Sequence, residues 1–437
     1  MEILVKIGQF LLSLSILIVL HEFGHYFFAR LFKTRVEKFY LFFDAGFSLF
    51  KFKKGETTYG IGWLPLGGYV KISGMIDESM DKEQMKKPAQ PYEFRSKPAW
   101  QRLLIMLGGV MVNFFLGFFI YAMVLFAWGE DYLPVKNMEY GVMVDSVAAE
   151  AGFENGDKII SLNGQKVERF SEIVPTILLE DIHTVQVERN GSLKDITLPP
   201  HILKKIIQGD KLFAPRYPFI VGQFGENSVG KTAGLKEGDR IIGVDTIQTL
   251  TADQLSPALR KYRNQSVDIH FVRSGMEETI NVQLDSTALL GIYVDPTKAL
   301  KFETRYYTFS ESFPAGVAKT YDMGKKYLQQ FKLIFSPETE AYKEIGGFIA
   351  IGNIFPGDWD WRAFWNLTAF LSIMLAILNL LPIPALDGGH VTFLLYEIIS
   401  GRKPGEKFME YAQITGMVIL LALLIFANGN DIIKLFN

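Results

Sequence analysis

The residues best suited to chemistry form a five-residue motif, HEFGH, at positions 21–25. On an α-helix, residues four apart lie on one face, one turn apart, so His21 and His25 can reach one ion at about 2.0–2.1 Å. Glu22 follows the first histidine and can reach a water at that ion without binding the ion itself. The chain has six histidines, so a chance H-E-x-x-H is on the order of one in a few hundred. The motif therefore predicts a metal site with Glu22 as its candidate general base.

The setting of the motif favours a functional interpretation. It lies at the end of an apolar run of the first 20 residues, where an ionisable group costs about 2.5–3.5 kcal/mol to insert into a bilayer. The alternative is that the histidines are satisfied core residues or lie at a wet interface. That alternative leaves the Glu22 carboxylate unexplained, whereas ionisable residues inside membrane segments are functional by default.

A second polar cluster, NLLPIPALDGGH, interrupts a later apolar segment between Asn379 and His390. Its prolines and glycines break any helix, and irregular backbone at membrane depth is tolerated only inside protein or along a wet cavity. A catalytic zinc site needs a third protein ligand and an open position. Asp387 is the expected third ligand. His390 competes for this place, but three neutral ligands would leave Asp387 buried and unpaired.

Asn379 begins the same cluster and has two interpretations. Its amide would donate a hydrogen bond toward oxyanion charge that develops during a reaction. Alternatively, it makes an interhelical hydrogen bond, as amides in membrane helices often do. Both interpretations stay open from the residues alone.

The elements that must position these residues are four apolar segments, each near the length of about 20 residues that a membrane crossing takes. They cover residues 3–32, 103–128, 364–381 and 411–427. The composition agrees, since 49% of residues are hydrophobic and 21% are charged, and it excludes intrinsic disorder. No cysteine is present, which excludes disulfides, thiolate zinc sites and a cysteine nucleophile. A net charge of −2 gives no electrostatic footprint for nucleic acid.

The membrane topology follows from the basic residues of short loops. No small-x-small cleavage site follows the first apolar run, so we expect a retained anchor and not a signal peptide. Basic residues gather between Arg30 and Arg102 and again between Arg402 and Lys407, so both loops should be cytoplasmic. Four crossings then place both termini and the long middle region on the outer side, which in a bacterium is the periplasm.

The middle region contains an internal repeat. AEAGFENGDKIISLNG, from Ala149, matches KTAGLKEGDRIIGVDT, from Lys231, at an offset of 82 residues. Each copy continues with alternating runs that predict a β-hairpin, around Asn190-Gly191 and Ser274-Gly275. The Gly-Asp-x-Ile-Ile core resembles PDZ domains, which bind an extended peptide at a sheet edge. The expected peptide-facing segments are 140–144 and 219–224, and the alternative is that both domains are spacers that bind no peptide.

The first cytoplasmic loop contains a predicted β-hairpin. Two apolar runs, from Phe39 and from Thr57, are expected to form strands around a turn near Lys54-Gly55 and to dip into the membrane interface. We expect the hairpin to offer an edge to which an unwound substrate adds as a strand. The alternative is that the hairpin is an amphipathic cytoplasmic cover.

With HEFGH, NLLPIPALDGG and a PDZ pair between them, the sequence resembles the site-2 protease family, and most closely its bacterial regulator-of-sigma-E protease branch. The resemblance covers nearly the whole chain and extends to LPLGGYVK (Leu64–Lys71) and FRSKPAWQR (Phe94–Arg102). Within the former, Gly67, Gly68, Tyr69 and Val70 are the candidate substrate-binding residues.

The resemblance implies Zn²⁺ bound by His21, His25 and Asp387, Glu22 as general base, and Asn379 as the asparagine near the metal. It also implies cleavage of single-pass transmembrane proteins in the bacterial inner membrane. Such substrates are anti-sigma factors already shortened by a site-1-type protease, or remnant signal peptides. The family often has Gly-Pro-x-x-Asn where this chain has Gly109 to Asn113 without the proline, and another family Gly-Pro is Gly347-Phe348 here. Both differences should alter backbone shape more than chemistry.

The expected fold class is therefore an α-helical polytopic membrane protein with a membrane-associated β-hairpin and two inserted β-rich, PDZ-like domains. Rival functions are a membrane-anchored PDZ peptide-binding scaffold with a non-catalytic metal site, and a zinc-handling membrane protein. The expected parts are a first transmembrane segment (1–32), a cytoplasmic loop with the hairpin (33–102), a second segment (103–128), the two β-rich domains (135–205 and 215–296), a linker with an amphipathic region (297–362), a third segment (363–390), a cytoplasmic loop (391–410) and a fourth segment (411–430).

Overall fold

The computed structural model describes the chain except for residues 66, 76–87, 210, 338 and 437, so part of the predicted loop 33–102 lies outside the described residues. The chain forms two compact units. The first unit comprises Met1–Gly129, Tyr306–Phe331 and Tyr342–Asn437. The second comprises Glu130–Arg305 and Lys332–Ala341.

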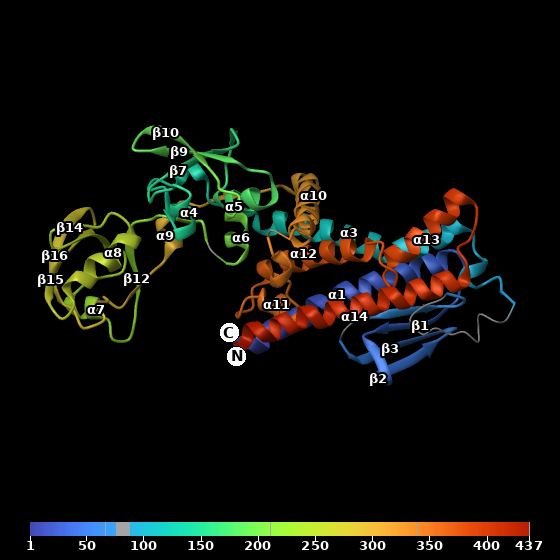
Figure 1. The fold of residues 1–437 in the computed structure, drawn as a ribbon. Helices are drawn as coiled ribbons and strands as arrows, with labels where there is room; N and C mark the ends of the chain where they lie inside the picture. The colour runs from blue at the N-terminus through green and yellow to red at the C-terminus, as the bar shows by residue number, and fades with distance from the viewer. Residues whose placement is uncertain (66, 76–87, 210, 338, 437) are drawn as a thin grey trace. The chain divides into compact units, whose positions relative to one another are not determined.

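In the described part of the first unit, four helices are long and apolar enough to cross a membrane (Figure 1). They are α1 (Glu2–Leu31), α3 (Ala99–Trp128), α12 (Trp361–Leu380) and α14 (Glu406–Phe436), and each covers one predicted segment. Glycines let α1 and α3 approach closely, as small residues do in membrane helix pairs. A Cβ on Gly24 would overlap the carbonyl oxygen of Gly108, so the glycine of HEFGH has a packing role.

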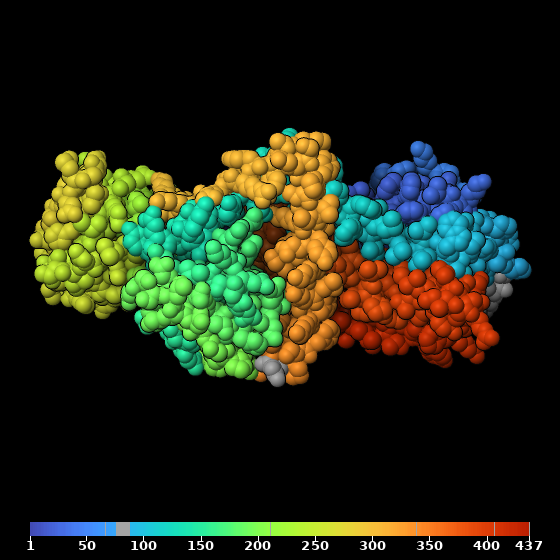
Figure 2. Space-filling model, turned by 90° about the horizontal axis from the view of Figure 1, so that it is seen from above, coloured from blue at the N-terminus to red at the C-terminus, as the bar shows by residue number. Residues whose placement is uncertain are grey.

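The third segment breaks where the prolines predict. Helix α12 ends at Leu380, and a new helix, α13 (Asp387–Ser400), begins at Asp387. The expectation of a loop over 391–410 is therefore wrong for residues 391–400. The reason is that no proline follows Pro384 in this stretch, and that Val391 and Leu394 pack with Ile105 and Met106 of α3. Figure 2 shows the red C-terminal residues beside the cyan residues of α3.

A four-stranded sheet follows α1 in the sequence and packs against it. Its strands are β1 (Val36–Leu41), β2 (Phe43–Lys54), β3 (Thr57–Leu64) and β4 (Tyr69–Ile72), in the order β2-β3-β1-β4. Gly55, at φ +62°, lies in the predicted turn between β2 and β3, so the hairpin is present. The predicted second strand is in fact two strands, β3 and β4. Strands β2 and β4 therefore form the two ends of the sheet.

The predicted linker 297–362 contains two helices of the first unit. Helix α10 (Phe309–Ile334) packs on α3, where a Cβ on Gly316 would lie 2.8 Å from the backbone nitrogen of Ala122. Helix α11 (Phe348–Asn353) is joined to α14, because the Asp431 carboxylate accepts the backbone N–H groups of Ile349 and Ala350 at 3.0 Å. The Phe348 N–H, which a family proline would lack, lies 3.3 Å from Asn428 Oδ1.

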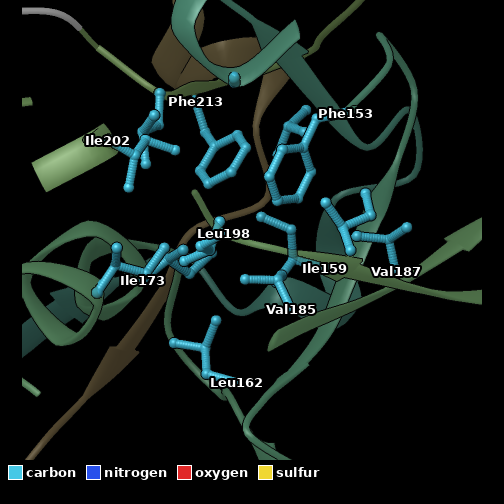
Figure 3. Packing of buried hydrophobic residues seen from close by; sticks show 14 of the residues in the cluster. Phe153, Ile159, Leu162, Ile173, Val185, Val187, Leu198, Ile202 and Phe213 are labelled. Carbon is cyan, nitrogen blue, oxygen red and sulfur yellow. The ribbon is translucent and has the colours of Figure 1, made fainter. Parts of the chain in front are cut away.

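The second unit contains the two sequence repeats, and each has its own hydrophobic core. Figure 3 shows that of the first repeat, where Phe153 and Phe213 pack near Ile159 and Val185. Its elements are β6 (Val142–Val144), α4 (Ser146–Glu150), β7 (Lys158–Leu162), β8 (Gln165–Lys166), α5 (Phe170–Leu179), β9 (Thr184–Arg189), β10 (Ser192–Thr197), α6 (Ile202–Ile207) and β11 (Phe213–Pro215).

The second repeat follows the same order. Its elements are β12 (Phe219–Phe224), α7 (Val229–Ala233), β13 (Arg240–Val244), β14 (Ile247–Gln248), α8 (Ala252–Leu259), β15 (Ser266–Arg273), β16 (Met276–Gln283) and β17 (Ile292–Val294). The aspartates of the repeated Gly-Asp pair are both 1% exposed. Asp157 binds Arg189 through two hydrogen bonds of 2.7 Å, and Asp239 binds Arg273 at 2.8 and 2.7 Å. The aspartate of the repeated Gly-Asp pair therefore has a structural role, because it forms a buried ion pair in each copy.

The expectation that segments 140–144 and 219–224 face a peptide is wrong in the structure. Strand β12 lies between β13 and β17, so both of its edges are used. Strand β6 pairs with β11, and Val142 exchanges backbone hydrogen bonds with residues 156 and 157 on its other side. The strands that cover these segments are β17, which ends its sheet, and β11, and both come much later in the sequence than the strands they cover.

Candidate metal and active site

Three side chains from two helices converge in the first unit. His21 and His25 lie on α1, and Asp387 is the first residue of α13. His21 Nε2 lies 3.2 Å from His25 Nε2, and these atoms lie 3.1 and 3.3 Å from Asp387 Oδ2. Donors at about 2.05 Å from a tetrahedral zinc ion are separated by about 3.3 Å. The three distances therefore have the spacing of one face of a zinc coordination sphere.

The protonation of this group also fits a cation. His25 Nδ1 lies 2.8 Å from the backbone oxygen of Ile105, and a carbonyl can only accept, so Nδ1 carries the hydrogen and Nε2 presents a lone pair. Asp387 Oδ2 is buried and makes no hydrogen bond within the described residues. Lone pairs that face one another across about 3 Å repel, and a dication between them removes that repulsion. The donor set thus fits zinc.

Gly109 of α3 lies in close contact with the two imidazoles. A Cβ at this position would lie 2.5 Å from His25 Nε2 and 2.7 Å from His21 Nε2. Any side chain at position 109 would therefore fill the space where the two ring nitrogens point. The glycine of the family motif is kept here, and the missing proline at Val110 leaves α3 helical through this region.

Asn113, one turn further along α3, contacts the other nitrogen of His21. The Asn113 carboxamide is fully buried, and its Nδ2 lies 3.2 Å from His21 Nδ1. Its Oδ1 has no partner within the described residues. A carboxamide can present either end. If Oδ1 faces His21, it accepts the Nδ1 hydrogen, and His21 Nε2 then presents a lone pair in the same way as His25.

The remaining predicted polar residues lie nearby. Asn379, in the last turn of α12, has its Nδ2 3.4 Å from His21 Nε2. His390 lines the same cavity as the three donors but is not part of their group. The structure therefore brings Asn379 to the edge of the donor set and leaves His390 outside it.

A cavity of about 620 Å³ opens beside the donor set. Glu22 lines it together with His21, His25 and Asp387, and so do Gly68, Tyr69 and Val70 from the start of β4. Gly67, the fourth candidate substrate-binding residue, is not among the lining residues. The backbone N–H of Val70 is directed at the Glu22 carboxylate, so the outer edge of β4 borders the cavity.

Two polar residues of this region, Asn113 and Gln413, are not predicted as site residues by the sequence. Asn113 was noted only as part of a family motif, and its contact with His21 depends on how α1 and α3 cross. Gln413 of α14 also lines the cavity. The signal that would have found it is a single amide near the start of an apolar segment, because such a group is costly there unless it has a partner.

Comparisons with known proteins agree with this geometry. The model of peptidase family M50 matches residues 9–423. A relative from Haemophilus influenzae, named regulator of sigma E protease, is 26% identical over 472 residues, with 100% of each chain covered. A relative from Campylobacter jejuni, named as a zinc metalloprotease, is 30% identical over 429 residues, covering 98% of this chain and 93% of its own. A third, from Neisseria meningitidis and named likewise, is 27% identical over 453 residues, with 98% and 99% covered.

The family match spans both clusters that carry the resemblance found in the sequence, HEFGH and NLLPIPALDGG, and it confirms that resemblance. The names of the relatives identify zinc as the metal and proteolysis as the activity, and the four long apolar helices fit a multi-pass membrane protein. The chain therefore belongs to peptidase family M50, the zinc-dependent site-2 protease family.

Proposed function

We propose that the protein is an intramembrane endopeptidase of the bacterial inner membrane, which hydrolyses peptide bonds within the transmembrane segments of single-pass proteins. The observation that carries the proposal is the arrangement of His21, His25 and Asp387 around one point, beside a cavity that also contains Glu22. These groups lie at or next to apolar helices, so a substrate bond that reaches them must come from within the membrane.

His21 Nε2, His25 Nε2 and Asp387 Oδ2 would hold the zinc ion. When bound, zinc lowers the pKa of water to about 7 and polarises a carbonyl. Glu22 accepts the proton of the attacking water on its carboxylate and returns it to the leaving amine. Asn379 directs its amide toward the oxyanion that develops at the carbonyl. The Ile105 carbonyl holds His25 in the tautomer that leaves Nε2 free of hydrogen, and Asn113 would hold His21 in the same tautomer with its Oδ1 facing Nδ1.

The substrate must unwind before it reacts, because a transmembrane helix hides its carbonyls in hydrogen bonds. We propose that the unwound segment adds to the outer edge of β4, where Gly68, Tyr69 and Val70 line the cavity. This assigns the expected edge to β4, the last part of the predicted second strand, at the opposite end of the sheet from β2. The β2–β3 hairpin would then be the amphipathic cover at the lipid interface, and β4 would bind the substrate.

The substrate class is suggested by the relative named regulator of sigma E protease. Anti-sigma factors trimmed by an upstream site-1-type protease, and remnant signal peptides, are both single-pass segments with a short outer part. The two repeat domains of the second unit would be PDZ-like and periplasmic. We propose that they restrict entry to substrates whose outer part has been removed.

The test is Glu22→Gln, with Glu2→Gln in the first turn of the same helix as the matched control. The amide introduced by Glu22→Gln cannot accept the proton, so cleavage of a single-pass reporter should fall by about 10²–10⁴-fold. Zinc content should stay at one ion per chain, because Glu22 is not among the three donors. Unchanged cleavage in Glu22→Gln would contradict the role of Glu22 as general base and point to another catalytic group. Absence of cleavage by the zinc-loaded wild type would favour the alternative, a PDZ scaffold with a non-catalytic metal site.

A further inference from the structure

Helix α14 carries one buried amide in an otherwise lipid-facing surface. Among residues 407–427, the buried positions are Gln413 and Gly416, while nearly all of the apolar side chains from Met417 to Phe426 are exposed. Gln413 is 9% exposed. A helix that only anchored the chain in lipid would place an apolar residue at such a position, so this amide needs an explanation.

Gly416 allows the close helix packing that positions Gln413 beside the loop before Asp387. A Cβ at position 416 would overlap the carbonyl oxygen of Pro384, so only glycine lets α14 approach the loop before Asp387. Residues three apart share a helix face, so the same contact turns Gln413 toward that loop. Gln413 consequently lines the active-site cavity together with Ala385, Leu386 and Asp387.

The Gln413 amide faces this cavity without a partner among the described residues. Within the described residues, its side chain makes no hydrogen bond to another helix or to the loop. Amides that join membrane helices do so by bonding across the interface, and Gln413 does not. The polar atoms of Gln413 are not among the fully buried side-chain atoms that lack a partner, so the amide reaches the cavity that it lines. An amide placed in this way is free to bind a ligand of the cavity.

We propose that Gln413 binds the main chain of the unwound substrate inside the active-site cavity. This inference rests on the proposed intramembrane protease function. Strand β4 lines the cavity and would pair with one edge of an extended substrate, which leaves the carbonyl and N–H groups of the other edge to be satisfied. A glutamine side chain offers one acceptor and two donors in the pattern of a peptide group. Such a contact does not depend on substrate side chains, as suits an enzyme that cleaves varied apolar segments.

The first test compares Gln413→Leu with Thr415→Val. Thr415 is an exposed residue of the same helix whose hydroxyl bonds the carbonyl of Tyr411, so its replacement removes a polar group outside the cavity. Gln413→Leu should lower kcat/KM on a single-pass reporter about tenfold, mainly through KM, because a main-chain contact is present before and during the reaction. Thr415→Val should cleave as the wild type does.

Thermal stability and zinc content separate substrate binding from a structural role. Removing an unpartnered buried amide should leave the melting temperature of the full chain equal or higher, with zinc content unchanged. A lower melting temperature together with loss of zinc would show that Gln413 supports the fold, and would overturn the inference. Unchanged kcat/KM in Gln413→Leu would also overturn it. Failure of the wild type to cleave any reporter would instead contradict the proposed function.

A second test needs no turnover. A photo-crosslinking residue is placed at position 413 or at position 415 of the full chain carrying Glu22→Gln, and the reporter is added in membranes. We expect crosslinks to the transmembrane segment of the reporter from position 413 and few from position 415. Equal labelling from both positions, or none from 413, would show that the substrate does not pass this residue.

Discussion

The neighbours of the two imidazoles decide which ring nitrogen is available to zinc. His25 Nδ1 contacts the backbone of α3, at the Ile105 carbonyl, whereas His21 Nδ1 contacts a side chain of α3, that of Asn113. Only the second of these contacts can be altered by substitution. In metal sites such outer partners fix the tautomer of the histidine and change metal affinity by about 10–100-fold.

We predict that Asn113→Ala weakens zinc binding by about 10–100-fold, because His21 Nδ1 loses the group that holds its hydrogen. Asn113→Asp should retain zinc, since a carboxylate can only accept and so enforces the same tautomer. The measurement is competition with a chelator of known zinc affinity on the full chain. Ser372→Ala is the matched control, because Ser372 donates to the Asn113 backbone oxygen at 2.7 Å without contacting His21. Loss of zinc in Asn113→Asp but not in Asn113→Ala would mean that the amide donates to His21 instead.

Among the elements, strand β4 gives the most specific prediction about substrate binding. It is short, it ends the sheet, and the backbone N–H of Val70 is directed at Glu22. An N–H on the outer edge of a strand can be removed by proline without breaking the inner ladder. The contribution of the edge to substrate binding can therefore be separated from the stability of the sheet.

We expect Val70→Pro to reduce cleavage about tenfold or more, because the N–H directed at Glu22 is lost and a proline at this edge cannot donate to an added strand, while zinc content stays unchanged. Val70→Ala keeps the N–H and is the control for the loss of side-chain volume. The readouts are initial rates on a single-pass reporter and metal analysis of the purified protein. Equal rates for the proline and alanine variants would exclude this edge as the substrate site.

On the scale of the whole molecule, the larger segment of the second unit, Glu130–Arg305, is an insertion between two parts of the first. Strand β5 (Glu130–Tyr132) pairs with β18 (Glu303–Arg305), with Glu130 opposite Arg305. The chain therefore enters and leaves the second unit at adjacent positions. A short flexible linker can close the gap that remains when the two repeat domains are removed.

We predict that replacing residues 133–302 by a short Gly/Ser linker, with β5 and β18 retained, permits cleavage of an untrimmed single-pass substrate. The reason is that the insertion would no longer exclude a bulky outer part. The measurement is the ratio of initial rates on trimmed and untrimmed forms of one reporter, and this ratio should approach one. The same deletion carrying Glu22→Gln controls for other proteases. An unchanged ratio would exclude the second unit as the filter.

Much of this molecule follows from local rules. Helix periodicity places His21 and His25 one turn apart, and the length of the apolar runs gives α1, α3 and α12 to within a few residues and the core of the longer α14. Prolines end α12, and the 82-residue repeat predicts two similar domains. These features depend on residues near one another in the sequence, so the sequence alone was sufficient. The roles of the site residues remain predictions that the experiments above address.

Tertiary structure decided the features that depend on long-range pairing. Strands β17 and β11 cover the segments expected to face a peptide, because each edge is filled by a strand that comes about 70 residues later. The same holds for the site. Gly109, Asn113 and Gln413 contribute through how α1, α3 and α14 cross one another, and crossing geometry depends on packing between distant segments, which the spacing of residues along one helix does not specify.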